Sequence, residues 1–192
     1  MKRIFWMLCG VGLLAPVHAQ EQIPAPIQQA HWAVPSNEEV LRYELLPGGL
    51  AEAEPTPAVT VYANGLVEVS WPWYSSKAGE WQMSIPMSEL QQSMAGFASN
   101  GMLTMNQQDL VAANANAREE MRSSGVLTYN SDSSVSTITM KVTNDAGVIL
   151  PAEEKVLRWE GLQATAQQLN SEALDSYASI EAWLMSLAHR AA

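Results

Sequence analysis

The stretch that decides the fold is residues 58–72, AVTVYANGLVEVSWP, in which two Val-rich runs flank Asn64-Gly65. This pattern predicts a β-hairpin. A two-residue loop would place Val61 opposite Glu68 and mix the faces, whereas a three-residue loop over 63–65 pairs valine with valine. A slip of one residue would turn the whole apolar face outward, so we expect the second register, with Gly65 at positive φ. The residues expected on the buried face are Val59, Val61, Val67 and Val69.

Alternating apolar residues outside this hairpin predict further strands. The first covers Glu39–Leu46, with Leu41, Tyr43 and Leu45 inward, and ends at Pro47-Gly48-Gly49. Other strands are expected from Trp81 to Ile85, over 126–129 and 135–142, and over about 155–160. Pro72 lacks a backbone donor, so the strand before it either ends there or lies at an edge.

Apolar residues at helical spacing predict three helices. The first begins after Pro86, and Thr104 with Gln107 forms the expected capping box of the second. The last follows Ser171 and is the most regular, with a stripe of Ala173, Tyr177, Ile180, Leu184 and Leu187. The order of elements predicts an α+β fold: an antiparallel sheet of about six to seven strands, with two central helices and a C-terminal amphipathic helix packed on it.

The chain begins with features of a secretory signal peptide. Lys2-Arg3 precede an apolar run, and Val17-His18-Ala19 resembles a cleavage site. We therefore expect residues 1–19 to be a signal peptide cut near Ala19-Gln20, and the product to be periplasmic or secreted. Residues 20–37 are rich in Gln, Ala and Pro and predict a flexible leader, and 38–190 form the single domain.

Composition limits the classes of partner. The 192 residues include 10 basic and 20 acidic side chains, a net charge of −10, and cleavage after Ala19 would also remove the one cysteine, Cys9. Such an acidic protein is poorly suited to bind nucleic acid or an anionic membrane. No later apolar segment approaches the length of a membrane anchor, and the oligomeric state is left open.

The sequence contains no recognisable catalytic, metal or cofactor motif. The histidines that remain after signal-peptide cleavage, His31 and His189, have no partner at ligand spacing. No serine lies in a G-x-S-x-G turn. Glu153-Glu154 and Glu160 are interpreted as solvated charges. We therefore predict no enzyme activity, no metal and no cofactor.

Aromatic residues form the best candidate site. They are Trp71, Trp73, Tyr74 and Trp81. Trp71 and Trp81 are expected in the core, and Trp73 and Tyr74 are expected on the surface, where such rings often anchor protein interfaces. The alternative is that the latter two rings cover the open end of the core.

Residues 39–103 resemble a pattern in an uncharacterised family of small secreted bacterial proteins: a strand ending at Gly-Gly, a T-V-Y-x-x-G-x-V hairpin, then a helix. The segment Leu46-Pro47-Gly48-Gly49-Leu50-Ala51-Glu52 is also faintly similar to the start of emfourin-type metalloprotease inhibitors. The first resemblance implies a fold and the second implies inhibition. The function predicted is a non-enzymatic, exported protein-interaction module with a partner in the cell envelope. A protease inhibitor is the second possibility and a carboxylate-based hydrolase the third.

Overall fold

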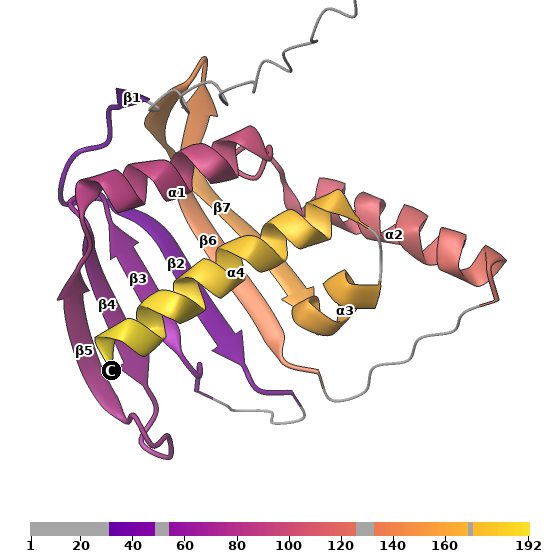
Figure 1. Cartoon of the computed structure of the whole chain (residues 1–192), viewed down its shortest axis with the longest axis horizontal. Helices are drawn as coiled ribbons and strands as arrows, with labels where there is room; N and C mark the ends of the chain where they lie inside the picture. The colour runs from indigo at the N-terminus through magenta and orange to yellow at the C-terminus, as the bar shows by residue number, and fades with distance from the viewer. Residues whose placement is uncertain (1–30, 49–53, 126–132, 169–170) are drawn as a thin grey trace, which may run out of the picture.

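The computed structural model describes residues 31–48, 54–125, 133–168 and 171–192 (Figure 1). Within them, seven strands form one sheet in the order β1-β7-β6-β2-β3-β4-β5. The strands are β1 (His31–Trp32), β2 (Glu39–Leu46), β3 (Ala58–Tyr62), β4 (Leu66–Trp71), β5 (Gly79–Ser84), β6 (Val135–Asp145) and β7 (Val148–Glu160). The helices are α1 (Met87–Ser99), α2 (Gln107–Ser123), α3 (Leu162–Gln168) and α4 (Glu172–Ala191).

The predicted α+β class and the packing of the C-terminal helix on the sheet are confirmed. Helices α1 and α4 lie across one face of the sheet, and α2 lies beyond its β7 side (Figure 1). Neighbouring strands are antiparallel except for β1, which pairs with β7 in parallel, so the sheet is mixed rather than wholly antiparallel. The short helix α3 was not predicted.

The β3–β4 hairpin has the predicted register. Val61 lies opposite Val67 and Val59 opposite Val69, and all four side chains are buried. Gly65 has φ 84°, and its carbonyl accepts a hydrogen bond from the Ile85 N–H at 2.9 Å. A backbone hydrogen bond therefore connects the hairpin loop to Ile85, the residue that follows β5.

Strand β7 is longer than predicted, because it begins at Val148 rather than near Lys155. A two-residue turn, Ala146-Gly147, connects it to β6, and both turn residues have positive φ. That geometry matches the twist of an antiparallel pair. Leu157 and Trp159 face the core as predicted.

Part of the stretch 20–37, which was predicted to be a flexible leader, belongs to the sheet. His31 and Trp32 pair with Val148 and Ile149, and Val34 is buried. The signal peptide over 1–19 and the strand predicted over 126–129 lie outside the described residues.

The core lies between the sheet and helices α1 and α4. Leu90, Met94 and Phe97 of α1 are buried, as predicted. In α4 the buried positions are Leu174, Ser176, Tyr177, Ile180, Glu181, Leu184, Leu187 and Ala188. Leu174 therefore takes the place predicted for Ala173, which is half-buried.

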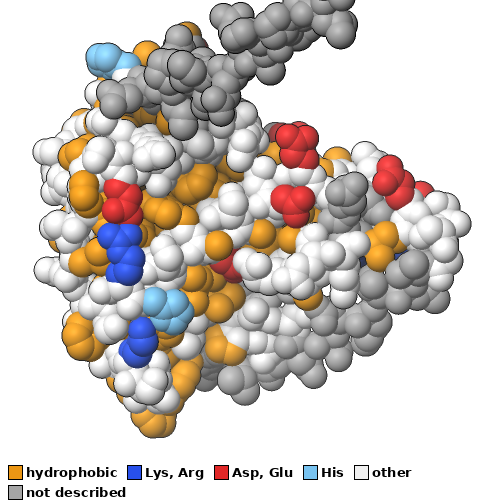
Figure 2. Space-filling model, viewed as in Figure 1, with side chains coloured by type: hydrophobic (Ala, Val, Ile, Leu, Met, Phe, Trp, Pro, Cys, Tyr) orange, Lys and Arg blue, Asp and Glu red, His pale blue; other side chains and the backbone are white. Residues whose placement is uncertain are grey.

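The charges of α4 match the direction of its dipole. Glu172 and Asp175 lie in its first turn, and His189 and Arg190 lie in its last. On the face shown in Figure 2, basic side chains and a histidine gather near the end of α4 beside β5, with an acidic side chain next to them, and further acidic side chains lie toward its other half.

The capping box of α2 differs from the one predicted over Thr104 and Gln107. The box is formed by Asn106 and Asp109, whose side chains each accept a hydrogen bond from the other's backbone N–H. Thr104 instead donates its hydroxyl to the Gly101 carbonyl, because it lies in the turn that precedes α2.

Candidate functional site

The predicted aromatic residues lie at the β5 end of the sheet. Trp73 is 82% exposed and Tyr74 49% exposed, as predicted, and Trp71 is buried, as predicted. The expectation that Trp81 lies in the core is wrong, since it is 40% exposed. Trp81 lies opposite the buried Val69 and thus on the core face, but β5 is the outermost of the described strands and no described strand pairs with its outer side.

Trp73 and Tyr74 differ in how firmly they are held. The Tyr74 hydroxyl donates to the Glu54 carbonyl at 3.2 Å and lies 3.0 Å from the Thr56 hydroxyl. Trp73 contacts the Tyr74 ring edge-on, with the ring centroids 5.7 Å apart. Tyr74 thus supports the neighbouring loop, and Trp73 is the more accessible anchor.

The loop between β4 and β5 is fixed by a second set of contacts. The Trp81 indole N–H donates to the Lys77 carbonyl at 2.9 Å. The Lys77 ammonium lies 5.7 Å from the Trp71 ring centroid and 3.1 Å from His189 Nδ1. These contacts fix the loop between β4 and β5, which carries Trp73 and Tyr74.

The two edges of the sheet differ in how far other parts of the chain cover them. On the β7 side, β1 covers Val148 and Ile149, and the Gln107 amide both donates to the Arg158 carbonyl and accepts from its N–H. Pro151 also removes a donor from β7. Among the described residues β5 pairs with β4 alone, and nearly all of its own residues are exposed, so it presents an open edge in this part of the chain.

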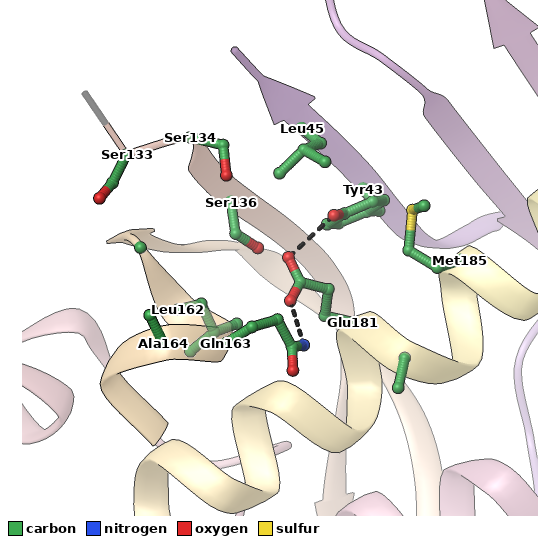
Figure 3. Close-up of a pocket in the computed structure, with 12 residues that line it drawn as sticks. Tyr43, Leu45, Ser133, Ser134, Ser136, Leu162, Gln163, Ala164, Glu181 and Met185 are labelled. Atoms are coloured by element: carbon green, nitrogen blue, oxygen red, sulfur yellow. Dashed lines mark hydrogen bonds between the residues drawn. The ribbon is translucent and has the colours of Figure 1, made fainter. Parts of the chain in front are cut away.

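A second candidate site is a pocket of about 510 Å³ between β2, β6, α3 and α4 (Figure 3). Glu181 of α4 lies in it and is 4% exposed. One carboxylate oxygen accepts from the Tyr43 hydroxyl at 2.8 Å, and the other accepts from the Gln163 side-chain amide. Burial, together with the charge of Glu181, raises the pKa of Tyr43 far above its usual value.

The Glu181 carboxylate has no basic counterpart in the part of the chain that the structure describes. Of the residues outside the described part, the internal segments 49–53, 126–132 and 169–170 contain no Lys, Arg or His, and residues 1–30 contain Lys2, Arg3 and His18. Ser136, 1% exposed, also lines the pocket, and its Oγ has no hydrogen-bond partner. The pocket therefore combines a buried carboxylate with an unused hydroxyl.

Sequence reasoning missed Glu181, although a signal was present. Glu181 follows Tyr177 by four positions and precedes Leu184 by three, so it lies on the apolar stripe of α4. An acidic residue on such a stripe must be buried with hydrogen-bond partners. Those partners, Tyr43 and Gln163, come from distant parts of the chain, and the sequence did not identify them.

The other function classes find little support in the described residues. Glu181 is the one carboxylate among the described residues lining the pocket, so the paired acids that a hydrolase would need are not found there. The described side chains contain no group of three or more His, Cys, Asp or Glu able to hold a metal. None of the described helices is both long and apolar enough to cross a membrane. Most of the Gly-Gly segment that resembles emfourin-type inhibitors, 49–52, lies outside the described residues.

Comparison of the chain with protein-family models, with curated proteins and with solved structures gave no match.

Proposed function

We propose that this protein is a non-enzymatic interaction module that binds an extended segment of a partner protein along the open edge of β5. The observation that carries this proposal is that the open edge of β5 bears the exposed ring of Trp81, while the loop that leads into β5 bears the exposed ring of Trp73. An edge strand offers backbone donors and acceptors to an added strand, and adjacent apolar surface accepts its side chains.

The direction of the backbone groups supports strand addition. The Ile85 N–H points toward Gly65 at the hairpin, so the alternate N–H groups of Glu80, Gln82 and Ser84 point away from β4. A partner strand would bond to these groups. Trp73 and Trp81 would then contact its side chains, because large exposed rings give contact area at low entropic cost.

We also propose that the module works outside the cytoplasm, with its partner in the cell envelope. The support is the basic start, apolar run and small-residue site of residues 1–19. Intact mass measurement of the exported protein should give a chain that begins at Gln20. A mature protein that retains Met1 would contradict this proposal.

The binding proposal is tested by Trp73→Ala. Because Trp73 is 82% exposed, the melting temperature should hardly change. Affinity for a partner found by crosslinking should fall by about 2 kcal/mol or more, as for an interface hot spot. Hydrogen exchange on the wild-type complex should show new protection at the outward amides of β5.

Val111→Ala is the matched control, since Val111 is also large, apolar and exposed but lies on α2. It should leave partner affinity unchanged. If Trp73→Ala instead lowers stability by about 3–5 kcal/mol, the ring covers the core and the proposed anchor is wrong.

A further inference from the structure

The Glu181 pocket has the features of a small-molecule site that differs from the β5 edge in place and chemistry. Its volume of about 510 Å³ lies within the range of about 300–1,000 Å³ that is typical of ligand pockets. Apolar side chains form much of its wall, and polar groups converge at one end (Figure 3).

Both oxygens of Glu181 accept hydrogen bonds, one from Tyr43 and one from Gln163. A buried carboxylate without a cation is costly to desolvate. A cation that enters the pocket would recover this cost, and an anion would be repelled.

Ser136 adds a second, independent polar group. Its buried hydroxyl lies near the Tyr43 and Tyr177 hydroxyls but has no hydrogen bond of ordinary geometry, and Figure 3 shows it directed toward Glu181. Buried hydroxyls are almost always hydrogen-bonded, so an unpaired one beside a carboxylate points to a ligand donor that contacts both groups. An ammonium group has three N–H donors and no acceptor, and it therefore matches this pair.

We propose that this pocket binds a small primary ammonium compound with an apolar body. The ammonium group would donate to the Glu181 carboxylate and the Ser136 hydroxyl. The apolar body would lie against Leu45, Leu162 and Met185, which also line the pocket.

The test is a titration of the full chain with phenethylamine, followed by ¹⁵N and methyl NMR. Phenethyl alcohol, which has the same apolar body and no charge, is the matched ligand. The amine should shift the signals of Ser136, Gln163 and Met185 in a saturable way. It should bind at least about tenfold more tightly than the alcohol, as expected for a charge-assisted hydrogen bond.

Glu181→Gln removes the charge with little change of shape, and it should reduce amine affinity to that of the alcohol. Glu172→Gln is the control, because it removes a charge from an exposed position on the same helix. Trp73→Ala should leave the amine titration unchanged, which separates this site from the β5 edge.

If Glu181→Gln does not fold, Ser136→Ala tests the proposed amine site instead. This change removes one of the two groups proposed to accept from the ammonium, and it should weaken amine binding by about threefold or more. Equal affinity for amine and alcohol, shifts confined to the surface, or no binding of either compound would overturn the proposal.

Discussion

Gly65 holds the β3–β4 hairpin at a backbone angle that a side chain would resist. Its φ is 84°, and an added Cβ would lie 2.5 Å from the Ile85 carbonyl oxygen. Gly65→Ala should therefore lower the free energy of unfolding by about 1–3 kcal/mol, through both backbone strain and this clash. Urea denaturation measures the loss.

The control for this substitution is Gly96→Ala in α1. A Cβ at Gly96 meets nothing within 4 Å, and its backbone is helical. Alanine should raise stability there by about 0.5–1 kcal/mol. Losses of equal size at the two sites would show that the hairpin geometry is not the cause.

Single residues also show where sequence reasoning succeeds and fails. The inward positions of Val59 and Val67 follow from alternation alone, because only one register keeps them buried together. Trp81 has the correct parity and is still exposed, since its place at the sheet edge depends on the order of all seven strands. Glu181 depends on distant partners and was missed for the same reason.

At the scale of elements, the start of α2 depends on Asn106. Its side chain accepts from the Asp109 N–H at 2.9 Å. Asn106→Ala should lower stability by about 1 kcal/mol, the usual effect of losing a helix cap. Thermal and urea unfolding measure the change.

Thr104→Ala is the informative comparison for that cap, because the sequence pattern favoured Thr104 as the capping residue. Its hydroxyl bonds only to the Gly101 carbonyl in an exposed turn. The loss of stability should be smaller than for Asn106→Ala. The reverse order would support the capping box over Thr104 and Gln107.

Long, regular elements were predictable and short ones were not. Helices α1 and α4 repeat apolar residues over several turns, and their burial follows from that spacing. Strand β1 has two residues and α3 has seven, too few for a periodic signal. The first half of β7 was missed because Pro151 and Glu153-Glu154 interrupt its alternation.

At the scale of the whole molecule, two buried tyrosines make stability sensitive to alkaline pH. Burial, with the charge of Glu181 adding to it, raises the pKa of Tyr43 and Tyr177 above the ordinary value of 10.0. The unfolded chain therefore loses these protons first. Stability should fall as the pH rises past about 10, by up to about 1.4 kcal/mol per pH unit for each tyrosine.

Urea unfolding at a series of pH values from 8 to 11, in about half-unit steps, tests this slope. Lys155 changes stability with pH in the opposite direction. Burial lowers its pKa, so its contribution to the free energy of unfolding rises as the pH approaches the ordinary lysine pKa. Tyr177→Phe removes one of the two phenols and should reduce the alkaline slope clearly. A slope that is the same in wild type and variant would contradict the role of this buried phenol.

The difference between the two edges of the sheet also limits how many copies of the protein could associate by strand pairing. Two copies that pair β5 with β5 about a twofold axis would join into one continuous sheet and use both open edges at once. The outer edges of that sheet would be formed by β1 and β7, where β1 pairs with Val148 and Ile149, Pro151 lacks a donor and Gln107 bonds to Arg158. Association through β5 therefore ends at two molecules, whereas a sheet with two open edges could grow into a fibre.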